Sequence, residues 1–94
     1  MEGVTVVDHV LLQRLVSILR DRHTPHGNFR QTLDDAAMIL AYEAMRGLRT
    51  DGIEVETPLE GAPGIQLADE VVIVAILRAG LGLVDGFLRL VPDA

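Results

Sequence analysis

Cysteine is missing from this 94-residue sequence and aromatic residues are scarce, with one tyrosine, two phenylalanines and no tryptophan. The absence of cysteine excludes a disulfide scaffold, thiolate metal ligands and a cysteine nucleophile. Apolar residues make up 49% of the chain. Because only three of the 94 residues are aromatic, the core must be aliphatic. A chain of this length forms one domain at most.

Lysine is also absent, and arginine supplies all eight basic residues against 14 acidic ones. The net charge of −6 argues against a general affinity for nucleic acid or anionic membrane, because both require a basic surface. The longest uncharged apolar run, Val71–Leu77, is too short to span a bilayer. The opening MEGVTVVDHV lacks the basic and apolar regions of a signal peptide. We therefore expect a soluble cytoplasmic protein.

Two helices are predicted in the first half of the chain. The first covers residues 8–22, with Asp8 as its N-cap and leucines and isoleucine repeating at helical spacing. The second covers residues 28–47, where Asn28 and Gln31 form a capping-box pattern and Gly47 provides a stop. Alanines along the apolar face of the second helix indicate close packing against another element.

A β-hairpin is predicted over residues 53–68. Residues 53–59 alternate apolar and polar side chains, as in a half-exposed strand. Pro58 cannot donate to a strand ladder, which places this strand at an edge or in a protruding arm. The glycines and proline of EGAPG predict the turn, and IQLA predicts the short return strand.

The segment Val71–Leu77 predicts a different kind of strand. It is continuously apolar and rich in valine and isoleucine, as expected for a strand buried on both faces of a parallel sheet. A loop and a third helix follow over residues 79–91. Each parallel neighbour needs its own crossover connection, and the sequence contains only one such strand. The 94 residues therefore resemble the front part of an incomplete α/β domain.

The strand leads into Arg78 and the glycine-containing residues 79–82, which together predict an anion site. Ligands of open α/β sheets bind beyond the carboxyl ends of the strands, and helix N-termini bind phosphate through backbone N–H groups. A guanidinium can add a bidentate pair to a phosphate. Alternatively, the glycines allow close packing and Arg78 pairs with a structural carboxylate. Neither the dinucleotide fingerprint nor a phosphate-binding P-loop is present.

Several segments resemble the uracil phosphoribosyltransferase family. ILRAGLGLVDG is similar to that family's I-L-R-A-G-L-G-M-V-D-G, and EVETPL is similar to E-V-x-T-P-L. HVLLQRLVSILRD and FRQTLDDAAMILAYEA resemble the family's opening helices. The resemblance runs in order from about residue 9 to residue 94 and covers nearly the whole chain.

The resemblance implies transfer of phosphoribose from PRPP to uracil, which gives UMP and pyrophosphate in pyrimidine salvage, with magnesium on the phosphates. It implies the N-terminal portion of a type I phosphoribosyltransferase-like parallel-sheet α/β domain. It further implies a homo-oligomer held through the arm at residues 53–68. The residues implied to bind the PRPP pyrophosphate are Arg78, Ala79, Gly80, Leu81 and Gly82.

The sequence also departs from the family pattern. Ala75 stands where the family strand carries proline. The threonine- and glycine-rich PRPP signature loop and the uracil-binding segment have no counterpart in these 94 residues, and no magnesium ligand is identified. We therefore expect the 94 residues alone to be inactive. The alternative is a non-catalytic relative that acts as an interaction or dimerisation module.

Other polar residues carry weaker signals. His23 and His26 have a spacing that suits a metal pair, but no third ligand is nearby in the sequence. His9 is expected to be a surface or capping residue. Asp34 and Asp35 are expected on the solvated face of the second helix, and Glu54 and Glu56 on the solvated face of the strand. Packing is expected for Tyr42 and Glu43, and structural hydrogen bonding for Asp85.

Overall fold

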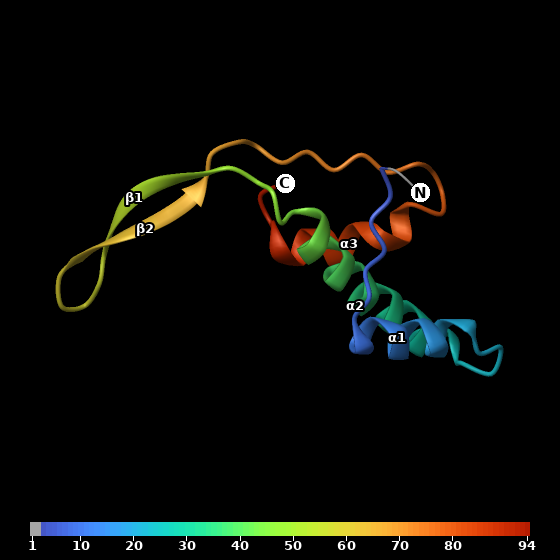
Figure 1. Cartoon of the computed structure of the whole chain (residues 1–94). Helices are drawn as coiled ribbons and strands as arrows, with labels where there is room; N and C mark the ends of the chain where they lie inside the picture. Colours follow the sequence, from blue (N-terminus) through green and yellow to red (C-terminus); the bar gives the residue numbers. More distant parts are fainter. Residues whose placement is uncertain (1–2) are drawn as a thin grey trace.

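A computed structural model describes residues 3–94 as three helices and a projecting β-hairpin (Figure 1). The elements in chain order are α1 (Val10–Arg20), α2 (His26–Ala44), β1 (Thr50–Glu56), β2 (Gly61–Leu67) and α3 (Leu81–Leu90). These bounds lie within a few residues of the predicted helices and hairpin. None of the helices in the described part of the chain is both long and apolar enough to cross a membrane.

Helix α2 is the centre of the helical layer and packs against both α1 and α3. Its small side chains permit this, since Ala37 and Ala41 are completely buried. Leu12 and Leu15 of α1 meet Ala36 of α2 in the main apolar cluster. The close packing predicted from the alanines of the second helix is therefore confirmed.

The helix starts differ from the predicted caps. His9, not Asp8, caps α1, because its Nδ1 accepts the N–H of Leu11 at 3.1 Å. Asp8 instead accepts a hydrogen bond from the Gln13 side chain at 2.5 Å. Helix α2 begins at His26, two residues before the predicted cap Asn28, because Pro25 precedes it with a φ of −59° that suits a helix start.

The hairpin is an antiparallel pair whose register joins Thr50 to Leu67 and Glu56 to Gly61. The predicted turn EGAPG was misplaced, because all of it after Glu60 belongs to β2. The actual turn is closed around Thr57, whose N–H donates to the Glu60 carbonyl at 2.9 Å. Strand β2 tolerates its proline because a two-stranded hairpin consists only of edge strands.

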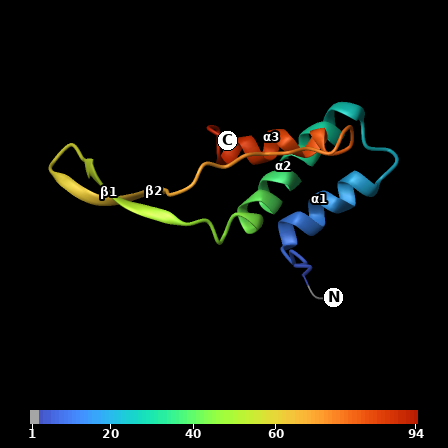
Figure 2. The same ribbon diagram turned by 90° about the horizontal axis from the view of Figure 1, so that it is seen from above.

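The predicted strand Val71–Leu77 is the main correction. The segment is extended but forms no strand, because none of the described residues offers a neighbouring backbone to pair with it. Figure 2 shows it running from the hairpin back along the helical layer to the start of α3. The parallel sheet expected from the sequence is therefore not formed within residues 3–94.

The molecule is extended. Its radius of gyration is 16.8 Å, against about 13 Å for a compact domain of 100 residues. The hairpin projects away from the helices in both views (Figures 1 and 2). Within residues 3–94 only five apolar residues are buried, which is a small core for this length.

Candidate functional site

Arg78 lies where the extended segment turns into α3, and its side chain is exposed. The peptide bond between Leu77 and Arg78 is cis. Among the residues that the structure describes, no carboxylate forms an ion pair with Arg78, whereas Arg46 and Arg49 each hold one. The guanidinium is therefore available to an external anion.

The backbone after Arg78 forms a tight turn that uses most of its own N–H groups. The Gly80 N–H donates to the Ile76 carbonyl at 2.9 Å, and the Leu81 N–H donates to the Arg78 carbonyl at 3.1 Å. The Gly82 N–H is taken up by the Ala79 carbonyl at 3.3 Å. In the described chain, the N–H groups of Leu77, Arg78 and Ala79 have no backbone acceptor in this turn. This turn therefore offers an anion fewer free backbone N–H groups than a free helix start would. The ligand role of residues 79–82 stays a prediction.

The glycines of this region have identifiable packing roles. A Cβ on Gly80 would lie 2.7 Å from the Ile76 carbonyl oxygen, so only glycine closes the turn. A Cβ on Gly86 would overlap the Ala37 Cβ and lie 2.7 Å from the Asp34 carbonyl oxygen. Gly86 therefore lets the backbones of α3 and α2 approach closely. The structural interpretation of these two glycines is confirmed, and it is compatible with an anion beside Arg78.

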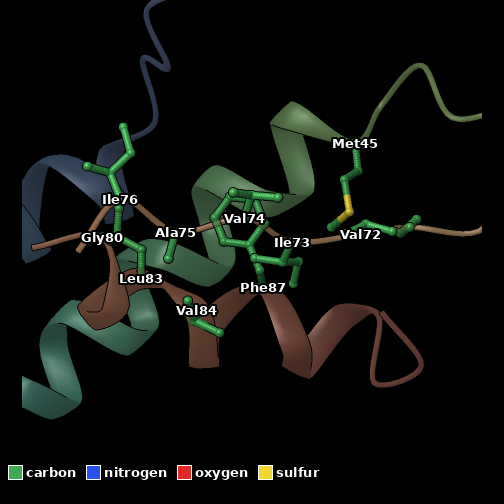
Figure 3. Close-up of a pocket in the computed structure, with 11 residues that line it drawn as sticks. Met45, Val72, Ile73, Val74, Ala75, Ile76, Gly80, Leu83, Val84 and Phe87 are labelled. Atoms are coloured by element: carbon green, nitrogen blue, oxygen red, sulfur yellow. The ribbon is translucent and has the colours of Figure 1, made fainter. Parts of the chain in front are cut away.

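An apolar groove of about 450 Å³ lies next to this turn, between the extended segment and α3. Figure 3 shows Leu83 and Phe87 on α3 beneath the segment, with Met45 at the other end. Val71, Ile73 and Ala75 turn toward it and are half-buried. Because its lining is almost wholly apolar, the groove is suited to hydrophobic side chains rather than to a phosphorylated ligand.

The other candidate residues fall outside this site. Within the described chain, no three histidine, aspartate or glutamate residues lie close enough to hold a metal ion. His23 is placed beside Asp21, with 3.1 Å between its Nδ1 and the carboxylate. His9 caps a helix, as expected.

Two exposed ion pairs were not foreseen from the sequence. Arg49 makes a bidentate pair with Asp69, at 2.7 and 3.0 Å, across the base of the hairpin. Arg46 binds Glu43 at 2.8 Å and lies 5.7 Å from the centre of the Tyr42 ring. The hydrogen bond from Arg46 lowers the pKa of Glu43 below its usual value. The three-residue spacing of Glu43 and Arg46 on a helix could have revealed their pair from the sequence. Arg49 and Asp69 lie twenty residues apart, so no local spacing indicates that they pair.

Comparison with known proteins gives the family of the chain. The family model of uracil phosphoribosyltransferase matches residues 6–94. The chain belongs to the uracil phosphoribosyltransferase family. The resemblance carried by the sequence motifs is therefore confirmed.

Individual relatives agree with this assignment. A uracil phosphoribosyltransferase from Salinibacter ruber is 58% identical over 94 residues, which cover 100% of this chain and 45% of the relative. One from Symbiobacterium thermophilum is 45% identical over 95 residues, covering 100% and 46%. A solved structure of an Aquifex aeolicus protein superposes with a TM-score of 0.87 at 33% identity, covering 96% of this chain and 44% of that one.

The chain spans less than half the length of the curated relatives it matches. The structural match confirms the expected fold class, a partial α/β domain of the phosphoribosyltransferase type. Within residues 3–94, the elements of that domain are the three helices and the hairpin.

Proposed function

We propose that this chain supplies the pyrophosphate-binding part of a uracil phosphoribosyltransferase that converts PRPP and uracil to UMP and pyrophosphate. Family membership supports the reaction. The observation that carries the site is the exposed guanidinium of Arg78, free of any carboxylate partner in the described chain, beside the unbonded N–H groups of Arg78 and Ala79.

Arg78 acts on the leaving group in this proposal. When the bond between the ribose carbon and the pyrophosphate oxygen breaks, negative charge collects on the departing pyrophosphate. A guanidinium can meet two of its oxygens at once, and fixed donors at the site of developing charge lower the barrier. The backbone of residues 79–82 holds Arg78 in position, and Gly80 allows the turn to close.

The rest of the active site comes from segments outside these 94 residues. The binding of the ribose 5-phosphate and of uracil requires a signature loop and a base-binding segment that the sequence does not contain. We propose that the chain is inactive alone and active when joined to such segments. Magnesium enters only as a partner of the PRPP phosphates, which can hold it through their own oxygens and water.

The remaining features of the proposal follow the family resemblance. The protein acts in pyrimidine salvage in the cytoplasm, and it forms a homo-oligomer through the hairpin arm. The geometry of the arm supports this last point, because β1 and β2 project from the helices and are exposed along almost their whole length.

A chimera tests the proposed site. The 94 residues replace the matched region of the Salinibacter ruber enzyme, and PRPP binding is measured by calorimetry. We expect Arg78→Ala to weaken binding by about 1.5–3 kcal/mol, the range for hydrogen bonds to charged groups, which is about 10- to 150-fold in Kd. Arg89→Ala, an exposed arginine at the other end of α3, is the matched control and should leave the Kd unchanged.

The two variants separate the possible outcomes. Equal PRPP affinity in wild type and Arg78→Ala removes Arg78 from the site. A folded chimera that binds no PRPP at all would support the alternative, a non-catalytic interaction module.

A further inference from the structure

The dipeptide Asp–Gly occurs twice in the sequence, and the fold places the two copies in opposite surroundings. Asp51–Gly52 lies in β1 of the projecting hairpin (Figure 1), where both residues are exposed. Asp85–Gly86 lies inside α3, where Gly86 is buried against α2. An aspartate followed by glycine is prone to isomerise, because glycine has no side chain to hinder attack of its backbone nitrogen on the aspartate carboxyl group.

This isomerisation proceeds through a cyclic succinimide and conserves mass. At the first copy, the Gly52 nitrogen attacks Cγ of the protonated Asp51 carboxyl group. A C–N bond forms, and the N–H proton leaves with the carboxyl OH as water. Water then opens the ring. Attack at Cγ restores aspartate, whereas attack at the main-chain carbonyl breaks its C–N bond and gives isoaspartate. Nothing is oxidised or reduced.

The hydrogen-bond ladder of the hairpin leaves the Gly52 nitrogen free for this attack. Backbone hydrogen bonds close the ladder at its two ends, from the Thr57 N–H to the Glu60 carbonyl and from the Ala68 N–H to the Arg49 carbonyl. The register between them is continuous, and hydrogen-bonded pairs alternate with non-hydrogen-bonded pairs along antiparallel strands. Gly52 therefore falls in a non-hydrogen-bonded pair, and its N–H is directed away from β2.

The position of Pro63 supports this phase of the ladder. Pro63 stands opposite Glu54, which the same alternation places in a non-hydrogen-bonded pair, where a missing N–H costs no ladder bond. Little else restrains the Asp51–Gly52 peptide. Nothing lies within 4 Å of the position that a Gly52 Cβ would take. Turning this peptide toward the Asp51 carboxyl group disturbs only the pair with Gln66, in a two-stranded hairpin that is marginally stable by itself.

The second copy is held by both its helix and its neighbour. Gly86 lies in the interior of α3, where helical geometry directs its N–H to the carbonyl of Gly82. A Cβ on Gly86 would overlap the Ala37 Cβ and lie 2.7 Å from the Asp34 carbonyl oxygen, so the peptide before Gly86 has no room to turn. Isomerisation of Asp85 therefore requires α3 to unwind and leave α2.

We propose that Asp51 is a site of spontaneous conversion to isoaspartate while no partner covers the hairpin, and that the fold protects Asp85. Isoaspartate adds one carbon to the main chain of β1. The residues on its two sides then no longer share the register that joins Thr50 to Leu67, and the hairpin loses pairing toward its base. The product presents a free α-carboxylate at position 51, so the enzyme class that would act on it is a carboxyl methyltransferase that uses S-adenosylmethionine.

Tryptic mapping of the whole 94-residue chain tests the proposal. Because lysine is absent, trypsin releases Asp51 within residues 50–78 and Asp85 within residues 79–89. The folded chain is aged in dilute solution below its Tm and then digested, and electron-transfer fragmentation distinguishes isoaspartate from aspartate in each peptide. We expect at least tenfold more isoaspartate at position 51 than at position 85. The same two peptides, aged after digestion, should isomerise at comparable rates because the fold no longer protects either copy.

A variant at the attacking residue gives a second test. Gly52→Val should slow isomerisation of Asp51 at least tenfold, because a branched side chain hinders the attack. Valine suits a strand and has room at this position, so circular dichroism should show the helix content of wild type. Equal isoaspartate at positions 51 and 85 of the folded chain, none at position 51, or an unchanged rate in Gly52→Val overturns the proposal. The assay reads covalent structure and does not depend on the proposed activity.

Discussion

The contact between α2 and α3 allows a sharp test, because it depends on the absence of a single side chain. A Cβ at Gly86 would overlap the Ala37 Cβ and lie 2.7 Å from the Asp34 carbonyl oxygen and 2.8 Å from the Met38 nitrogen. Two of these three atoms belong to the backbone of α2 and cannot rotate away. The substitution Gly86→Ala must therefore push the two helices apart.

The expected loss follows from two opposing effects. Overpacking against fixed backbone costs about 3 kcal/mol, the upper end of the usual range, while replacing glycine by alanine inside a helix gains about 1 kcal/mol. We expect Gly86→Ala to lower the free energy of unfolding by about 2 kcal/mol, which corresponds to a fall in Tm of about 8–16 °C for a domain of this size. Such a loss is large for a protein with so small a core.

Gly27→Ala is the matched control, because Gly27 is also helical and nothing lies within 4 Å of the position its Cβ would take. It should raise stability by about 0.4–1 kcal/mol. Both variants are measured by thermal and urea unfolding followed by circular dichroism at 222 nm. If Gly86→Ala is as stable as wild type while Gly27→Ala behaves as expected, the close approach of α2 and α3 is refuted.

The remaining predictions concern the two exposed ion pairs. Arg46 lowers the pKa of Glu43 by hydrogen bonding, so the charged carboxylate favours the folded state. This stabilisation is present above the ordinary carboxyl pKa of 4.5 and is lost as the pH falls through the lowered value. The difference in Tm between wild type and Glu43→Gln should therefore shrink between pH 6 and about pH 3, and a constant difference would contradict the pairing. Arg49→Gln removes the bidentate pair with Asp69 and should reduce overall stability by no more than about 1 kcal/mol because the pair is exposed. Hydrogen exchange should nevertheless become faster in β1 and β2, and unchanged exchange there would show that the pair does not hold the base of the hairpin.

Local sequence patterns predicted the helices and the hairpin because these elements satisfy their own hydrogen bonds. Their ends were less predictable. Asp8 and Asn28 are both good cap residues, but His9 and Pro25 determined where the helices begin. Several residues near each helix start can serve as the cap, and sequence alone does not choose among them.

The conformation of residues 71–77 could be predicted only in part. Its extended backbone follows from its β-branched composition, but a strand also needs a neighbour, and the described chain supplies none. The candidate site could likewise be predicted only in part. The sequence placed Arg78 at the end of this segment, whereas the packing roles of Gly80 and Gly86 depend on contacts with Ile76 and with α2 that no spacing rule reveals.

The extended segment Val71–Leu77 has a consequence for solubility. VVIVAIL is a seven-residue run of high β-propensity without charge, proline or glycine, which is the composition that favours stacking of identical chains into cross-β fibrils. Asp69 and Glu70 stand before it and Arg78 stands after it, so charged gatekeepers flank it on both sides. Besides the anion binding proposed above, Arg78 thus has a second physical role, since its charge opposes the growth of a fibril from the segment that it follows. We expect the balance between these three charges and the seven apolar residues that they flank to limit the concentration at which the free protein stays in solution.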